Sequence, residues 1–264
     1  MRALALISGL ALALGSCILD SNIDDFTFEL PEKTFEVDTD QIEVPTQTSI
    51  PCVPDPDSCA QLSPDLVCGA GDVCEVLDPD VIPAIPCDAQ DDPCAELGPE
   101  FSCDLGAGSC VGEFYFSLMA PVNLSSEVPE LQTIGQAPLV SVEFDHVSMR
   151  VEENSLTVAT PEIVFYLSPQ TVSSLWVAQT DPPQLSPGVV KMGTLPPIPA
   201  STWGMTEDVV LDAQGNATLT QYCREPSVPF NMFAGTVMTL RAGDPVPSGR
   251  IRLVVDAAAT ASLH

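Results

Sequence analysis

The chain has 264 residues, of which 45% are hydrophobic, and its formal net charge at pH 7 is −29. The acids gather toward the N-terminus, because residues 18–149 hold 27 Asp and Glu against one base, Lys33, whereas residues 150–264 hold 10 acids against six bases. The electric field of so many negative charges repels phosphate groups, so nucleic acid is excluded as a partner. Divalent cations or basic partners would be attracted, although a solvated, solubilising surface is the simpler interpretation of the charge.

Residues 1–16 predict a secretory signal peptide. Arg2 supplies the positive charge, and residues 3–14 are apolar apart from Ser8 and Gly9. This run is shorter than the roughly 20 residues that a membrane-spanning helix needs. It ends in Leu14-Gly15-Ser16-Cys17. An ordinary signal peptide, cut at a small residue and leaving Cys17 free, is the alternative interpretation.

The sequence LGSC at Leu14–Cys17 resembles the lipobox of bacterial lipoproteins. The resemblance implies cleavage before Cys17, diacylglycerol on its sulfur, an acyl chain on its amine, and hence the membrane as a partner. Residues 17–25 would then form a lipidated acidic tether. The lipobox resemblance also implies that the protein is located in the cell envelope. Ile18 after the cysteine favours the outer membrane, on its periplasmic face or at the cell surface.

Residues 26–45 predict N-terminal strands that join a larger sheet. Phe26, Phe28 and Leu30 alternate with polar residues, and after Pro31 the alternation resumes at Phe35 and Val37. A period of two is typical of a half-buried strand. Because the neighbouring sequence offers no other apolar surface, we expect these strands to pair with the sandwich predicted below.

Residues 46–111 contain two copies of one four-cysteine module, at 52–74 and 87–110. The copies are offset by 35 residues, with one inserted residue before the last cysteine. Their composition is poor in aromatics and rich in Pro, Asp and Gly, so they cannot build a core without covalent help. The cysteines are Cys52, Cys59, Cys68, Cys74, Cys87, Cys94, Cys103 and Cys110.

Three kinds of chemistry could explain these cysteines. Zinc sites usually pair ligands two to four residues apart, often with His, but here six, eight and five or six residues intervene and neither module contains His. Redox motifs need Cys-x-x-Cys near basic groups. The spacing and the compartment therefore predict two disulfides per module. Three connectivities remain open in each, of which first-to-third with second-to-fourth is favoured.

Residues 112–264 predict a β-sandwich. Phe114 and Phe116 share one strand face, and a register shift near Asp145-His146 predicts a β-bulge. A hairpin is predicted over 208–223, with its turn at Gln214–Asn216, and one helix over 168–176. The predicted fold is thus mainly β: an antiparallel β-sandwich with an inserted disulfide-rich, loop-rich region of two small repeats.

The sandwich and the modules resemble those of uncharacterised Gram-negative envelope lipoproteins with tandem four-cysteine repeats. That resemblance carries no known active site, so it assigns no residue beyond Cys17.

Cys223 is the cysteine left over. It falls on a predicted strand, where we expect it to be a buried, inert thiol. Intermolecular disulfide pairing is the alternative. His146, beside the predicted bulge, is expected to be structural, and Trp176 and Trp203 are expected to pack in the core or in loops. Close acid pairs fall in turns, where Asp favours the turn itself, with calcium as the alternative. The pairs are Asp55/Asp57, Asp78/Asp80, Asp91/Asp92 and Glu152/Glu153.

The sequence predicts no catalytic residue, no metal ligand and no cofactor site. We therefore expect a membrane-anchored envelope lipoprotein with a non-enzymatic structural or protein-interaction role, and an envelope protein or a glycan as its partner. A carbohydrate- or calcium-dependent surface adhesin is the first alternative, favoured if Trp176 or Trp203 is exposed on one rim. A secreted hydrolase, using His146 or two carboxylates, is the second.

Overall fold

The computed structural model describes residues 25–39, 47–53, 57–88, 93–128, 131, 139–177 and 182–263. The predicted signal peptide and Cys17 lie outside these residues. Within them the protein is mainly β, with antiparallel strands, as the alternation predicts. No helix in the described residues is long and apolar enough to cross a membrane.

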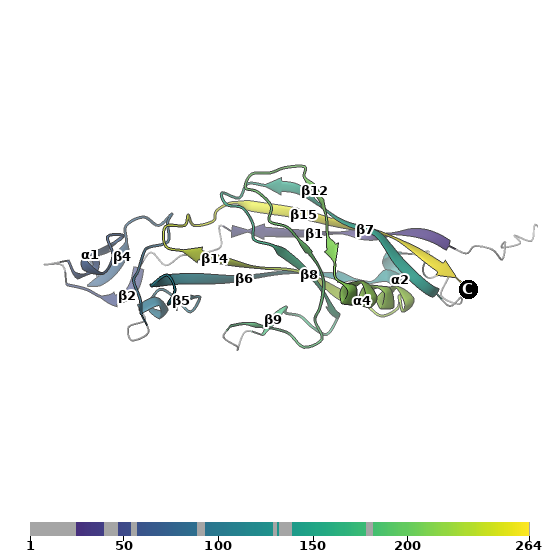
Figure 1. Cartoon of the computed structure of the whole chain (residues 1–264), viewed down its shortest axis with the longest axis horizontal. Helices are drawn as coiled ribbons and strands as arrows, with labels where there is room; N and C mark the ends of the chain where they lie inside the picture. The colour runs from purple at the N-terminus through teal and green to yellow at the C-terminus, as the bar shows by residue number, and fades with distance from the viewer. Residues whose placement is uncertain are drawn as a thin grey trace, which may run out of the picture.

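Two antiparallel sheets form the sandwich, and their longest strands run along the long axis of the molecule (Figure 1). The four-stranded sheet has the order β1 (Asp25–Asp38), β15 (Arg250–Leu263), β7 (Leu139–Asn154) and β12 (Thr206–Asp208). The six-stranded sheet has the order β13 (Val210–Leu211), β11 (Val190–Leu195), β8 (Ile163–Pro169), β14 (Phe230–Arg241), β6 (Ser109–Val122) and β5 (Phe101–Asp104).

The alternating residues of β1 supply one wall of the sandwich core. Phe28, Leu30 and Phe35 are buried between the sheets. The ring of Phe35 lies 6.0 Å from that of Phe165 on β8, so the two sheets meet through this aromatic contact. β1 pairs with β15 from Asp25 opposite Ser262 to Asp38 opposite Arg250. The N-terminal strand is therefore an edge of the sandwich.

The bulge predicted near Asp145 is present in β7. Ala258 of β15 pairs with His146 and Ala259 pairs with Phe144, so Asp145 is the extra residue. The bulge restores the register, because Val142 and Phe144 before it and Val147 after it all contribute to the same core.

The two disulfide modules cover one end of the sandwich (Figure 1). The first contains β2 (Gln47–Pro51), α1 (Ser58–Leu62), β3 (Leu66–Cys68) and β4 (Val73–Val76), with the sheet order β2-β4-β3. The second contains the 3-10 helix η2 (Pro93–Glu96), β5 and the first residues of β6.

The modules share a core with the sandwich. Ile82, Leu97 and Phe101 of the module region cluster with Met238 and Leu240 of β14. Backbone hydrogen bonds join the segment between the modules to the loop after β14: the Ile82 N–H donates to the Asp244 carbonyl at 3.0 Å. The modules are thus held against the sandwich by side-chain packing and by strand β6, which runs from the second module into the sandwich.

Four further elements complete the described chain. They are α2 (Leu124–Glu127), β9 (Trp176–Val177), β10 (Gln184–Leu185) and the longest helix, α4 (Ala213–Arg224). β9 and β10 pair with each other.

The hairpin predicted over 208–223 is wrong, because most of this segment is helix α4. The Asp212 side chain caps the helix by accepting from the Gln214 N–H at 2.9 Å. Gly215, Leu219 and Cys223 are buried on one face. Their spacing of four residues is a helical period, which the apparent alternation of the segment obscured.

The helix predicted over 168–176 is also wrong. Ser168 and Pro169 complete β8, where they pair with Asn231 and Phe230 of β14, and Trp176 begins β9. Pairing with a central strand outweighed the local helix-start signal of Ser168-Pro169.

Gly215 permits α4 to approach β11 closely. A Cβ atom at this position would lie 2.4 Å from the Cα and 2.5 Å from the carbonyl oxygen of Met192. Backbone atoms cannot move aside as a flexible side chain can, so this contact requires glycine.

We predict that Gly215→Ala destabilises the protein, although Ala favours helix over Gly by about 1 kcal/mol. The clash with Met192 should lower the free energy of unfolding by roughly 1–3 kcal/mol, measured by urea denaturation followed by circular dichroism. Gln214→Ala, at the adjacent exposed position, is the matched control and should be neutral or slightly stabilising. A Gly215→Ala protein as stable as wild type would contradict the close approach.

Candidate functional site

Each module is held by two disulfides. The pairs are Cys52–Cys68, Cys59–Cys74, Cys87–Cys103 and Cys94–Cys110. The pairing is first to third and second to fourth in both modules, so the internal repeat in sequence is also a repeat in covalent structure. Closing loops of this size stabilises a segment by about 3 kcal/mol each, chiefly by restricting its unfolded state.

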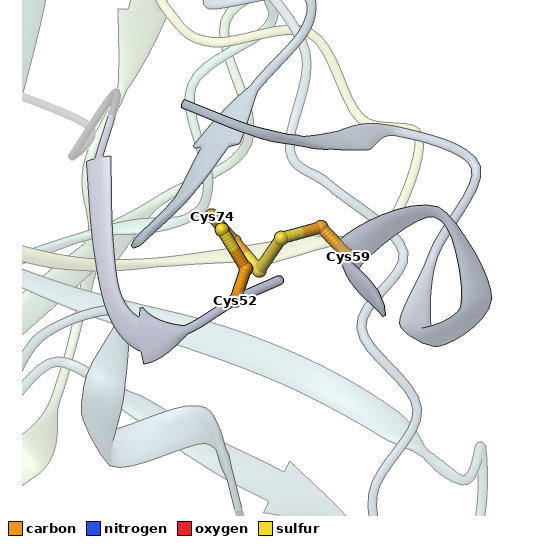
Figure 2. Close-up of side chains that lie close together, drawn as sticks. All are labelled: Cys52, Cys59 and Cys74. Carbon is orange, nitrogen blue, oxygen red and sulfur yellow. A yellow bond between two sulfur atoms is a disulfide. The ribbon is translucent and has the colours of Figure 1, made fainter. Parts of the chain in front are cut away.

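The crossing pairs bring sulfur atoms close together. The sulfurs of Cys52, Cys59 and Cys74 all lie within 4.8 Å of one another, and Figure 2 shows the sulfur of Cys52 beside the Cys59–Cys74 bond. Such a cluster has the size of a metal site, but a metal binds thiolates. Here every one of these sulfurs is already joined to another in a disulfide, so the cluster consists of two neighbouring disulfide bonds.

The second module repeats this arrangement with Cys87, Cys94 and Cys110. Among the described residues, these two are the only groups of three or more His, Cys, Asp or Glu side chains close enough to share an ion.

Asp57 organises the first module. Its carboxylate accepts the N–H groups of Cys59 at 2.9 Å and Ala60 at 3.3 Å, which caps α1, and that of Cys68 at 3.1 Å, which ties α1 to β3. These bonds, led by the one from Cys68, lower the pKa of the carboxyl from its ordinary value of 3.8, against desolvation, which raises it.

Of the other acid pairs, Asp78 likewise accepts from the Asp80 N–H within a turn. Asp55, Asp91 and Asp92 lie outside the described residues. The turn expected at Glu152/Glu153 is wrong, because both residues belong to strand β7.

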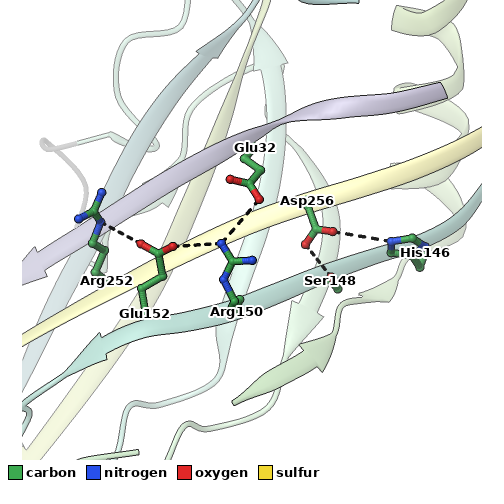
Figure 3. Close-up of polar contacts among 7 residues, drawn as sticks. All are labelled: Glu32, His146, Ser148, Arg150, Glu152, Arg252 and Asp256. Carbon is green, nitrogen blue, oxygen red and sulfur yellow. Dashed lines mark hydrogen bonds and ion pairs between the residues drawn. The ribbon is translucent and has the colours of Figure 1, made fainter. Parts of the chain in front are cut away.

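The outer face of the four-stranded sheet carries a network of charges (Figure 3). Arg150 contacts Glu152 at 3.0 Å and Glu32 at 3.6 Å, and Glu152 also lies 3.4 Å from Arg252. The hydrogen bond from Arg150 to Glu152 raises the pKa of the guanidinium group above its usual value. Because these side chains are substantially exposed, solvent screens the network and its contribution to stability is small.

His146 belongs to the same face. Its Nε2 lies 3.7 Å from Oδ2 of Asp256, and Oγ of Ser148 donates to Oδ1 of the same carboxylate at 2.6 Å (Figure 3). The order of contacts is therefore serine, aspartate, histidine. In a hydrolytic triad the histidine stands between the other two, where it can accept the serine proton. The arrangement here is that of a polar surface cluster beside the bulge.

The two tryptophans occupy different environments. Trp176 is half-buried on the six-stranded sheet, with its ring 5.4 Å from Tyr115 and 6.4 Å from Tyr166. Trp203 is 69% exposed, although its Nε1 donates to the Asn154 carbonyl at 2.7 Å. The expectation of packing therefore fails for Trp203. A short, polar Ser-Thr-Trp-Gly segment was the sequence signal that it lies on a surface loop.

Cys223 is fully buried, as expected, but on helix α4. Burial raises the pKa of its thiol from 9.0 to about 12. The thiolate, which is the reactive form, is thus scarce at neutral pH.

Sequence reasoning missed the gathering of Arg150, Arg250 and Arg252 on one sheet face. The signal was available for two of them, because Arg250 and Arg252 stand two residues apart on a strand and so project from the same face. Their proximity to Arg150 depends on the pairing of β15 with β7.

Comparison with known proteins yields little. No family model matches the chain, and no curated protein matches it. Among solved structures, a chain of Desmodium yellow mottle tymovirus is similar over 58% of this chain and 88% of its own, with 12% sequence identity and a TM-score of 0.23. A score this low does not equate the two folds, and nothing about this protein is drawn from it.

We predict that Asp57→Asn loosens the first module at neutral pH. Because folding lowers the pKa of this carboxyl, its stabilising effect is present above about pH 4 and is lost as the pH falls through the lower, folded-state value. Hydrogen–deuterium exchange of residues 57–68 should be faster in the variant at pH 7, and the difference should shrink at pH 2–3.

Asp208→Asn, at an exposed position on β12, removes the same charge far from this cap and is the control. A difference between Asp57→Asn and wild type that stayed constant with pH would show that the carboxylate charge is not the cause.

We also predict that Cys223 resists thiol reagents in the folded protein. In a chain carrying Cys17→Ser, maleimide at pH 7.5 should label no residue without denaturant and one residue in 6 M guanidinium chloride, read by intact mass. Cys17→Ser/Cys223→Ser should take up no label under either condition. Rapid labelling of the native chain would contradict the burial of this thiol.

Proposed function

We propose that this protein is a membrane-anchored envelope lipoprotein with a non-enzymatic structural or protein-interaction role, exercised by its disulfide modules. One observation carries the proposal: the modules and the start of β1 lie at opposite ends of the sandwich (Figure 1). A chain anchored near its N-terminus would therefore carry the modules away from the membrane surface.

The dimensions support this arrangement. β1 has 14 residues, which span about 45 Å at the rise of a strand. Cys17 precedes Asp25 by eight residues, and eight residues reach at most about 28 Å. An acyl anchor on Cys17 would thus hold the sandwich close to the membrane, with the modules one strand length farther out.

The surface of the modules supports an interaction role. Val53 and Leu105 of the modules are 58% and 65% exposed, and Leu77 in the segment between them is 59% exposed. Burying such side chains against a partner is favourable. Leu77 and Leu105 each adjoin an acid, Asp78 and Asp104. A protein that contacts these positions would therefore present apolar residues next to basic ones.

The test places a photo-reactive amino acid at Leu105 in the full-length chain and irradiates intact cells. The expected result is one discrete protein adduct in the membrane fraction. With Cys17→Ser in addition, the chain should incorporate no labelled fatty acid.

Val210, which is 68% exposed on the sandwich, is the matched position and should give no adduct. Equal adducts at both positions would overturn the role of the modules. Fatty-acid labelling that persists in Cys17→Ser would overturn the anchor.

The exposure of Trp203 favours one alternative, a glycan-binding adhesin. Its indole nitrogen is held by the Asn154 carbonyl, and Ser201 and Gly204 on either side adopt positive φ angles of 54° and 66°. A ring presented in a fixed orientation, with much of its surface in solvent, can stack on the apolar face of a sugar.

We predict that, if the adhesin interpretation holds, Trp203→Ala abolishes retention of the protein on immobilised cell-wall polysaccharide. Trp203→Phe should retain part of the binding, because a flat ring remains. Wild-type protein that is not retained would exclude this alternative.

A further inference from the structure

A narrow apolar cavity lies between the two sheets, apart from the surfaces considered so far. Its volume is about 50 Å³, enough for about four water-sized positions at roughly 10–15 Å³ each. Both sheets and the loop before β8 contribute to its walls. Representative residues are Val37, Leu118, Leu156, Pro161, Met238 and Leu253.

The polar atoms of the wall are already engaged. The hydroxyl of Thr39 donates to the Gly249 carbonyl, that of Thr160 accepts the Ile198 N–H, and that of Thr236 donates to the Glu162 carbonyl. The cavity thus presents methyl and methylene groups. Water needs two to four polar partners to be stable in such a space, so an apolar occupant is favoured.

The cavity opens at the side of the sandwich because of the sheet topology. β5 pairs only with residues 109–112 of β6, so the rest of β6 is the edge of its sheet, and β1 is the edge of the other. Between these edges lies a side cleft of about 490 Å³, which shares Val37, Phe116 and Leu118 with the cavity.

A second opening lies toward the disulfide modules. This end cleft has a volume of about 300 Å³ and shares Thr160, Pro161 and Met238 with the cavity. The side cleft and the end cleft therefore each adjoin the cavity. A narrow apolar cavity with a cleft on either side suits an unbranched hydrocarbon chain better than a ring system.

The mouth of the side cleft carries both signs of charge. Glu36, Asp38 and Arg250 line it, and Nε of Arg250 lies 2.8 Å from Oδ2 of Asp38. A head group with a phosphate and an ammonium could place the first beside Arg250 and the second beside Glu36. A purely anionic head group would meet two carboxylates and the large negative charge of the whole chain.

We propose that the cavity binds the hydrocarbon chain of a single-chain zwitterionic lipid, with the head group at the side cleft between β1 and β6. The site is built from the sandwich alone, so it does not depend on the anchor or on the modules. The ligand class is that of lysophospholipids with a choline or ethanolamine head.

The test uses the full chain with Cys17→Ser and lysophosphatidylcholines below their micelle-forming concentrations. Isothermal titration calorimetry should show one site per chain. Affinity should rise about fourfold for each added methylene, which is the effect of burying one CH₂ group, until the apolar space is full, and should then stay constant.

Ala234→Leu fills the cavity, since Ala234 lines it, and should weaken binding at least tenfold. Met119→Phe adds similar bulk on β6 at an exposed position and should bind as wild type. Melting temperatures show whether each variant folds. The chain-length series on the unaltered cavity decides the matter if Ala234→Leu does not fold.

Arg250→Gln tests the head group. It should weaken lysophosphatidylcholine severalfold and leave monoacylglycerol unchanged, and myristate should bind more weakly than either lipid. Three results would overturn the site: no binding by the protein with the unaltered cavity, equal binding by Ala234→Leu, or an affinity that rises without limit as the lipid chain lengthens. A preference for myristate would overturn the zwitterionic head group.

Discussion

The structure depends on the continuity of strand β6. Its first residues form the hairpin of the second disulfide module, and its last residues, such as Val122, lie in the core of the sandwich. One strand therefore transmits the position of the sandwich to the modules without an intervening linker. The same strand creates the opening in the sandwich, because its partner β5 ends early and leaves most of β6 as a sheet edge.

The acidity of the N-terminal region explains why that region depends on disulfide bonds. The N-terminal region carries many carboxylates and few large apolar residues, so hydrophobic burial alone could not hold it in one conformation. The four disulfides restrict its unfolded state, Asp57 uses a carboxylate to cap and tie α1, and the core shared with Met238 and Leu240 supplies the missing apolar surface. Its charge can then remain in water.

The sequence predicted the elements whose signal is local and repeated. The strand β1, the bulge at Asp145 and the sandwich class follow from the period-two alternation of apolar residues, and the disulfides follow from a repeat visible within the chain. Helix α4 and the segment 168–176, which ends β8 and begins β9, were misassigned. In α4 the buried residues recur every fourth position, but Ala and Thr between them also fit an alternating pattern. At the end of β8, the dipeptide Ser168-Pro169 is typical of a helix start, but in the structure it pairs with Asn231 and Phe230 of β14.

By itself, then, the sequence determined what is covalent or periodic in this protein: the stapled modules, the face that each long strand buries, and the separation of charge along the chain. The tertiary structure alone decided which segments meet. It placed Gly215 against Met192, gathered the arginines of β7 and β15 on one face, left Trp203 in solvent, and formed the apolar cavity between the sheets. These features arise from contacts between residues far apart in the chain, and no pattern within a single segment encodes such a contact.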